Sequence, residues 1–186
     1  MASDIAGKRV LILSIGTRGD VQPFLVLAAA LRRAGAEPLL ATLPHYTHLG
    51  REFGVRVVSI LADGVRWPEP ADLGDAAEDK DVFEEKLIFE PYAAHTSGML
   101  ARVRALATEH GSHVVVVGML IWYVQWLREA LRLPLVHAHL QPTRWLSSER
   151  AVARPRPPKL FGKLFGSKGK PDKRLCVKYG VPCAGK

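Results

Sequence analysis

Residues 8–24 constrain the fold more than any other part of this chain. They read Lys-Arg-Val-Leu-Ile-Leu-Ser-Ile-Gly-Thr-Arg-Gly-Asp-Val-Gln-Pro-Phe, so an apolar run breaks at Gly16 and Gly19, and a helical pattern begins directly afterwards. An apolar run that ends in glycines is typical of a buried strand followed by a tight loop. The segment therefore predicts a strand, a loop and a helix, which is the opening unit of a parallel α/β domain.

Strand and helix patterns alternate along the rest of the chain. Strands are predicted at residues 10–15, 39–43, 55–60, 114–117 and 135–139, and helices at 23–34, 45–53, 81–89, 92–110 and 120–131. A long loop rich in Asp, Gly and Pro is predicted at 61–79. Strands that alternate with helices predict an α/β fold with a doubly wound parallel sheet and right-handed crossovers.

Asp20 lies in the loop at the carboxyl end of the first predicted strand, where such sheets hold their ligand sites. Two interpretations of this residue remain open. Its carboxylate can act as the N-cap of a helix that begins near Val21, with Pro23 in the first turn. It can also act as a general base that takes the proton of a substrate hydroxyl.

The loop lacks the features of a dinucleotide-binding site. That site needs three glycines in the pattern GxGxxG, which let a pyrophosphate approach the start of the helix. Here Gly16 and Gly19 are the two glycines of the loop, and the bulky Arg18 lies between them. Asp20 would also repel a phosphate, so the sequence argues against a redox enzyme of the dinucleotide-binding class.

The nonapeptide Gly-Thr-Arg-Gly-Asp-Val-Gln-Pro-Phe at residues 16–24 resembles the N-terminal signature of GT-B glycosyltransferases of the family 28 and sterol glucosyltransferase type. The resemblance continues through the segments that follow, up to residue 60, and the later Leu-Gln-Pro-Thr-Arg at 140–144 is similar to a segment near the end of that family's N-terminal domain. It spans about residues 8–145 and implies a Rossmann-like domain over residues 1–145, followed by a basic tail at 146–186.

The resemblance also implies an activity. Members of this family transfer a hexose from a nucleotide sugar, here expected to be UDP-glucose, to a hydroxyl on a lipid, sterol or similar apolar acceptor, with inversion. By this resemblance Asp20 is the base, and Gly16, Thr17, Arg18 and Gly19 shape the loop that faces the donor. The nucleotide sugar is a co-substrate, and the resemblance implies neither a metal nor another cofactor.

The length of the chain limits this expectation. A chain of 186 residues has room for one such domain. In the resembled family a C-terminal domain makes most contacts with the nucleotide sugar, and no segment here resembles it. The chain is therefore expected to be inactive unless a C-terminal glycosyltransferase domain is supplied, for example in trans. The alternative is a non-catalytic domain that binds an apolar ligand or a partner subunit.

Three residues are candidates for binding the acceptor. His45 follows the second predicted strand, and Trp122 and Trp126 are four apart, so they share one face of a predicted helix. The two indoles can line an apolar acceptor pocket. The alternative interpretations are a surface histidine and two tryptophans of the hydrophobic core.

The basic character of the chain is confined to its end. Residues 144–186 hold 12 Lys and Arg against 2 acidic residues, whereas the preceding part has a net charge of −2. This distribution argues against nucleic-acid binding by the folded domain. The repeat Lys-Leu-Phe-Gly-Lys-Leu-Phe-Gly at 159–166 suits either an anionic membrane surface or a solvated linker. Without a signal peptide or a transmembrane-length apolar run, the expected location is the cytoplasm, with peripheral membrane contact as an option.

Overall fold

The computed structural model describes residues 4–79, 82, 86–87, 90–118, 124–138 and 140. The chain divides into two compact units, one formed by the segment up to Arg66 together with Gly98–Leu140, and the other containing Trp67–Ser97. The predicted domain boundary at residue 145 and the 159–166 repeat lie outside the described residues, and so do six of the nine residues of the predicted helix at 81–89. No helix in the described part of the chain is long and apolar enough to cross a membrane.

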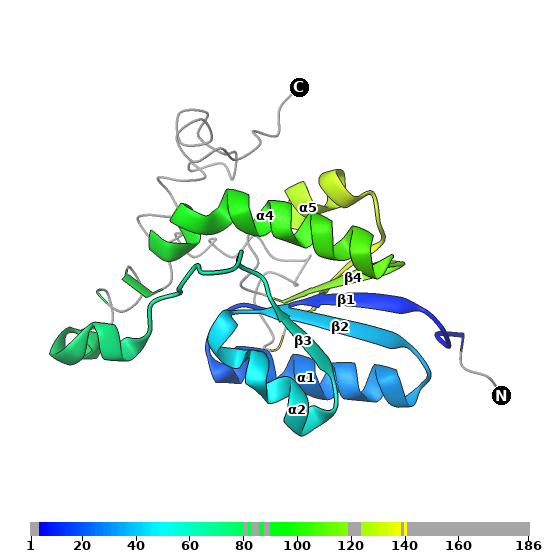
Figure 1. The fold of residues 1–186 in the computed structure, drawn as a ribbon, viewed down its shortest axis with the longest axis horizontal. Helices are drawn as coiled ribbons and strands as arrows, with labels where there is room; N and C mark the ends of the chain where they lie inside the picture. The colour runs from blue at the N-terminus through cyan, green and yellow to red at the C-terminus, as the bar shows by residue number, and fades with distance from the viewer. Residues whose placement is uncertain are drawn as a thin grey trace, which may run out of the picture. The chain divides into compact units, whose positions relative to one another are not determined.

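The first unit is built on a five-stranded parallel sheet with the order β3-β2-β1-β4-β5 (Figure 1). The strands are β1 (Arg9–Leu13), β2 (Glu37–Thr42), β3 (Arg56–Ser59), β4 (Val114–Gly118) and β5 (Leu135–Ala138). All neighbouring pairs are parallel, as β1 with β2 and β1 with β4 illustrate. The predicted α/β fold with a doubly wound parallel sheet is confirmed.

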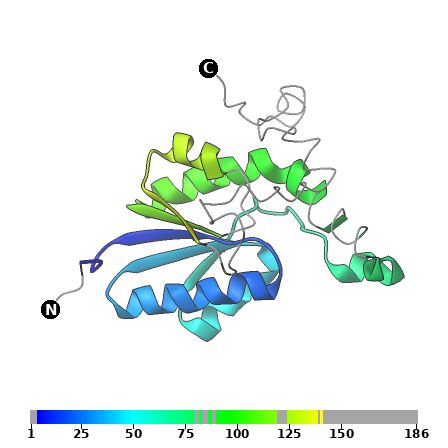
Figure 2. The same ribbon diagram turned by 180° about the vertical axis from the view of Figure 1, so that it is seen from behind.

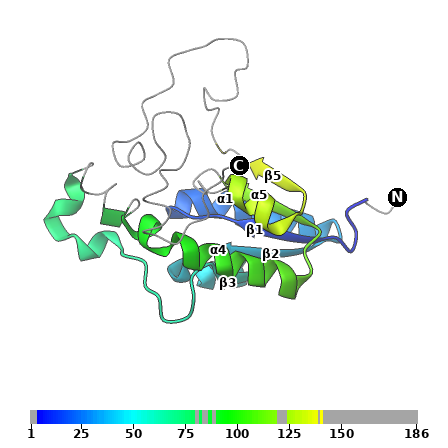
Figure 3. The same cartoon turned by 90° about the horizontal axis from the view of Figure 1, so that it is seen from above.

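Helices cover both faces of this sheet. Helix α1 (Arg18–Arg33) and the short α2 (Gly50–Phe53) lie on one face (Figures 1 and 2). The other face is covered by α5 (Val124–Leu131) and by the part of α4 (Glu90–His110) from Gly98 onward, which belongs to the first unit. Figure 3 shows α4 and α5 next to one another over the strands. The direction of winding reverses between β1 and β4, so the carboxyl ends of these two strands form the topological switch point, where open α/β sheets bind ligands.

The central strands are continuously apolar because both of their faces are covered. Leu11, Ile12 and Leu13 of β1 are fully buried. Phe24 and Leu25 of α1 pack into the same cluster as Ile12 and the Leu40 side chain of β2. Each such side chain contributes roughly 1.5–3 kcal/mol on burial. This packing fixes the start of α1 against the end of β1, which is where the candidate site lies.

The ends of several elements differ from the sequence-based prediction. Helix α1 begins at Arg18 rather than at residue 23, so Pro23 lies inside the helix and not in its first turn. Proline removes one helical hydrogen bond, to the carbonyl of residue 19. Because Gly19 is exposed to solvent, water can take the place of that bond. The helix ends as predicted, with Gly35 at φ +91° directly after the C-cap Ala34.

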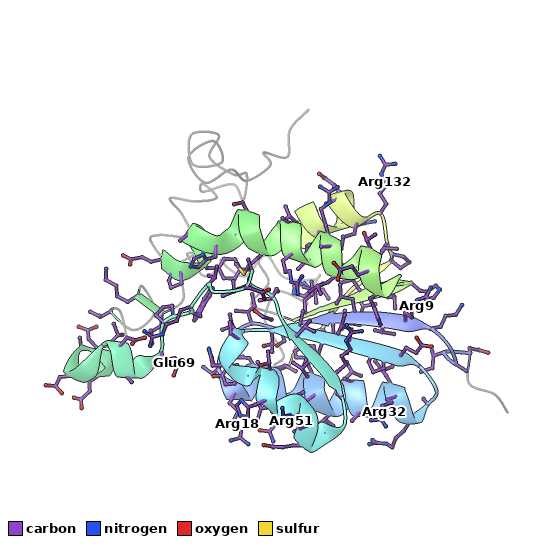
Figure 4. All side chains as sticks on the ribbon, viewed as in Figure 1. Arg9, Arg18, Arg32, Arg51, Glu69 and Arg132 are labelled. Atoms are coloured by element: carbon purple, nitrogen blue, oxygen red, sulfur yellow. The ribbon has the colours of Figure 1, made fainter. Side chains whose placement is uncertain are left out.

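The segment after β2 is also more irregular than the predicted helix at 45–53. It forms the 3₁₀ turn η1 (Pro44–Leu49) and then the four-residue α2, which ends at Gly54 with φ +62°. The Arg32 guanidinium of α1 donates a hydrogen bond to the Gly54 carbonyl, which joins the two helices (Figure 4). In the second unit the predicted loop at 61–79 contains two 3₁₀ turns, η2 (Pro70–Asp72) and η3 (Gly74–Glu78).

His110, the last residue of α4, makes stability depend on pH. Burial, together with the Arg56 and Arg9 charges, lowers the pKa of His110 below 6.5. The unfolded chain therefore binds a proton at a higher pH than the folded chain, and stability falls as the pH drops below about 6.5. We expect urea unfolding of His110→Gln to show a smaller loss of stability between neutral and mildly acidic pH than the wild type. The exposed His48→Gln is the control, and an unchanged pH dependence in His110→Gln would contradict the expectation.

Candidate active site

The candidate site is the loop between β1 and α1, at the switch point of the sheet. Gly16 adopts φ +132°, a backbone conformation that only glycine takes readily, and it turns the chain from the strand into the helix. The buried Ser14 ties the two elements together, since its Oγ donates to the Asp20 carbonyl at 3.0 Å. Its backbone N–H donates to the Ala41 carbonyl of β2 at 3.1 Å.

Asp20 forms a capping box with Thr17, which is the N-cap of α1. The Thr17 N–H donates to the Oδ2 atom of Asp20 at 2.8 Å, and the Thr17 hydroxyl donates to the same Oδ2 at 2.9 Å. The predicted N-cap role for Asp20 is therefore wrong, because Asp20 is the third residue of the helix. Its side chain still helps to cap the helix, in the way that the third residue of a capping box does.

The two oxygens of the Asp20 carboxylate differ in their surroundings. Oδ2 accepts both bonds from Thr17, whereas Oδ1 has no hydrogen bond to any described residue. The Asp20 side chain is partly exposed. The structure thus holds, at the switch point, a carboxylate with one oxygen bound by Thr17 and the other without a hydrogen bond from the described residues.

Arg18 and Gly19, which the sequence assigns to the same loop, are exposed. Residues two apart in a helix point in different directions, so Arg18 does not face Asp20. Figure 4 shows the Arg18 side chain extending away from the sheet on the side of α1 and α2. The structure brings Thr17 and Asp20 together but not Arg18, and the roles of Gly16, Arg18 and Gly19 toward a donor stay predictions.

Gly118, the last residue of β4, is a site residue that the sequence analysis missed. A Cβ atom at this position would lie 3.2 Å from the Leu13 carbonyl oxygen and 3.2 Å from the Phe24 ring. The end of β4 therefore approaches β1 and α1 closely, and a larger residue would push against them. The signal in the sequence is a glycine directly after a run of four valines.

The predicted acceptor residues are only partly described. His45 lies in η1, directly beyond the carboxyl end of β2, and its ring makes an edge-to-face contact with Tyr46 at 4.1 Å between centroids. Trp122 and the side chain of Trp126 lie outside the described residues. Whether His45 lies near either indole is therefore untested. Their role in acceptor binding stays a prediction. Among the described residues, no group of three His, Cys, Asp or Glu side chains is arranged to hold a metal ion.

Trp67 is the centre of an aromatic cluster in the second unit. Its indole is buried, and Nε1 donates to the Leu87 carbonyl at 2.9 Å. The Tyr92 ring meets it at a right angle with 6.4 Å between centroids, and the His95 ring lies at 6.3 Å. Trp67 of the predicted loop at 61–79 thus packs against Tyr92 and His95 of α4 in an aromatic cluster. The signal was a lone tryptophan in a polar segment.

Thr42 at the end of β2 carries a buried hydroxyl with no hydrogen-bond partner among the described residues. It is fully buried. A buried hydroxyl without a partner reduces stability, and an apolar group of the same shape avoids that cost. We expect Thr42→Val to raise the free energy of unfolding by about 1 kcal/mol in urea titrations. Ser14→Ala is the matched control. It should lower the free energy of unfolding, because the Ser14 hydroxyl has a hydrogen-bond partner that the substitution leaves unpaired. Equal destabilisation of both variants would contradict the expectation.

Comparison with known proteins identifies the family. Residues 10–109 match the glycosyltransferase family 28 N-terminal domain. The chain is 33% identical over 115 residues to the dTDP-epi-vancosaminyltransferase of Amycolatopsis orientalis, covering 55% of this chain and 29% of that protein. It is 36% identical over 55 residues to the sterol 3-beta-glucosyltransferase of Pichia angusta, covering 30% of this chain and 4% of that protein. The chain thus spans less than a third of the length of each relative.

The fold agrees with this assignment. The Streptomyces sp. SF2575 glycosyltransferase SsfS6 superimposes with a TM-score of 0.54 at 16% identity, over 96% of this chain and 48% of that chain. The nonapeptide loop with Asp20 falls within the part of the chain that matches the family, together with β2, β3 and nearly all of β1, whereas β4 and β5 follow it in the chain. The chain belongs to glycosyltransferase family 28 and carries its N-terminal domain.

Proposed function

We propose that this domain forms the acceptor side of a hexosyltransferase, and that Asp20 is its general base. The observation that carries the proposal is the Asp20 carboxylate at the switch point, held through Oδ2 while Oδ1 makes no bond to a described residue. A general base must lie within hydrogen-bond reach of the proton that it removes. The Asp20 side chain is partly exposed at the ligand edge of the sheet, a place where it can meet this condition for a bound hydroxyl.

The proposed reaction is a single displacement. Asp20 takes the proton of the acceptor hydroxyl, and the acceptor oxygen forms a bond to the anomeric carbon of the sugar. The bond from that carbon to the phosphate oxygen breaks, and the nucleoside diphosphate leaves with the electron pair. Attack from the face opposite the leaving group inverts the anomeric carbon.

The names of the relatives support a nucleotide-sugar donor. One is a dTDP-sugar enzyme and the other is a sterol glucosyltransferase. SsfS6 has also been solved with thymidine diphosphate. We propose UDP-glucose as the first donor to test and dTDP-glucose as the second. The acceptor is proposed to be an apolar alcohol such as a sterol, lipid or similar aglycone, in contact with His45, Trp122 and Trp126.

A donor-binding domain is part of the proposal. We propose that a C-terminal glycosyltransferase domain completes the site, either in the same chain or in trans, and the complete unit is called the assembled enzyme below. Contact of the basic segment at 146–186 with an anionic membrane remains a proposal for bringing the enzyme to a lipid acceptor.

The experiment that tests this function measures nucleotide release by the assembled enzyme. UDP-glucose and dTDP-glucose are each offered with a sterol, a long-chain alcohol and an aromatic aglycone. We expect acceptor-dependent release of the diphosphate from one donor, and NMR of the purified glycoside should show inverted anomeric configuration. Retention of configuration would contradict the single displacement, and release without any glycoside would contradict the transferase.

A further inference from the structure

We propose that Thr17 is a positioning residue that holds Asp20 by one oxygen and thereby reserves the other, Oδ1, for the proton of the acceptor. The inference rests on the proposed function, because it concerns how the base Asp20 is held. Thr17 was expected from the sequence only to shape the loop that faces the donor. The hydrogen bonds of the described residues assign it a different task.

Both donors of Thr17 converge on the same atom. The N–H and the hydroxyl reach Oδ2 at 2.8 and 2.9 Å. A carboxylate held by one donor rotates readily, since the last torsion of an Asp side chain has a broad, two-fold profile. Two donors from one residue define the plane of the carboxylate and oppose the exchange of its oxygens.

Thr17 is itself held in place. Its carbonyl accepts the N–H groups of Asp20 at 2.9 Å and Val21 at 3.2 Å, so the loop and the first helical turn are joined on the backbone side as well. The hydroxyl of Ser14, the residue directly after β1, donates to the backbone carbonyl of Asp20. The carboxylate of Asp20 is therefore held by Thr17, and its backbone is held by Ser14 and by the first turn of α1, which is the support that a catalytic group requires.

The arrangement selects which oxygen takes the proton. A proton arriving at Oδ1 breaks the O–H bond of the acceptor and forms an O–H bond on Asp20, while Oδ2 keeps both bonds from Thr17 as the carbonyl oxygen of the acid. A proton arriving at Oδ2 would have to compete with two donors already bound there. Among the described residues, none forms an ion pair with Asp20, and the Thr17 donors reach Oδ2 and not Oδ1.

Two substitutions isolate the contribution of the hydroxyl. Thr17→Val keeps the shape and the backbone N–H but removes the hydroxyl, and Thr17→Ser restores it. In the assembled enzyme we expect Thr17→Val to lower kcat about tenfold with little change in the KM for the acceptor, because a misaligned base slows the proton transfer and not the binding. Thr17→Ser should be close to the wild type.

A control separates positioning from loss of stability. Thr108 in α4 is exposed, and its hydroxyl donates to the Arg104 carbonyl at 3.0 Å. Thr108→Val loses a hydroxyl bond of similar length away from the site, so it should leave kcat unchanged. All variants are assayed at a temperature at which circular dichroism shows them folded.

A second measurement uses the full chain and needs no turnover. NMR on labelled protein detects the scalar coupling from the Thr17 amide nitrogen, across its hydrogen bond, to the carboxylate carbon of Asp20. We expect the coupling in Thr17→Val to fall by about half or more, because the bond loses its well-aligned geometry when the carboxylate turns. It should persist in Thr17→Ser.

The outcomes distinguish this inference from the proposed function. If Thr17→Val keeps either its coupling or its kcat at the wild-type level, while Asp20→Asn is impaired, the positioning role fails and the base remains. If Asp20→Asn retains full turnover, the proposed function fails, whatever the Thr17 variants do. A lower coupling together with a tenfold lower kcat, both restored by Thr17→Ser, supports the inference.

Discussion

Replacing Asp20 by Asn is expected to lower the turnover of the assembled enzyme by about 10²-fold or more. The amide cannot take the proton of the acceptor hydroxyl, so the nucleophile attacks without assistance. The fold should change little, because the Asn carbonyl oxygen can still accept the two bonds from Thr17 that now reach Oδ2. Steady-state kinetics with a saturating donor and a series of acceptor concentrations measure the effect.

The variant Asp20→Glu distinguishes the base from the capping residue. Glutamate at the third position of a helix is the usual partner in a capping box, so thermal stability should be retained. The additional methylene displaces the carboxylate from the position fixed by Thr17, and an error of this size is costly for a reacting group. We therefore expect low turnover at normal stability. Full turnover in both Asp20 variants would leave Asp20 with a structural role alone.

The fold was predictable because its central strands are buried on both faces. The apolar runs at β1, β2 and β4 are visible in the sequence, and their order gives the doubly wound sheet. The start of α1 was misplaced because Pro23 was taken as a first-turn residue. The Thr-x-x-Asp spacing of Thr17 and Asp20 does carry the correct signal, since it matches a capping box with the shorter acid at its third position.

The candidate site was predictable only in part. Asp20 could be found because it lies at the end of the first strand, but its two different oxygens follow from the direction of the Thr17 hydroxyl, which a sequence does not give. The need for glycine at position 118 depends on how closely β1 and α1 approach β4. That the Thr42 hydroxyl has no partner among the described residues depends on which neighbours surround it in the folded chain. Such features arise from tertiary packing: the glycine after four valines marks position 118 in the sequence, but the contacts that require it there follow only from the fold.

The chain without a donor-binding domain is expected to release no nucleotide above the spontaneous rate. The chain corresponds to 48% of the length of SsfS6 and to smaller shares of its curated relatives. Catalysis of a transfer requires both reactants to be held in contact, and correct placement contributes roughly 7–11 kcal/mol to lowering the barrier. A base in the acceptor domain lowers the barrier little when no donor-binding domain holds the nucleotide sugar next to the acceptor. The measurement is diphosphate release from UDP-glucose and dTDP-glucose with each acceptor, at high protein concentration.

The same samples provide the positive control. Adding a C-terminal donor-binding domain in trans, or joining it to the chain, should restore release, and the restored rate should depend on Asp20. Sustained, acceptor-dependent release by the chain alone would contradict the proposal that a separate domain binds the donor, because this domain would then hold both the acceptor and the nucleotide sugar. Restoration that is equally strong with Asp20→Asn would instead place the base on the added domain. Only restoration that requires Asp20 supports a hexosyl transfer in which this domain contributes the proton acceptor.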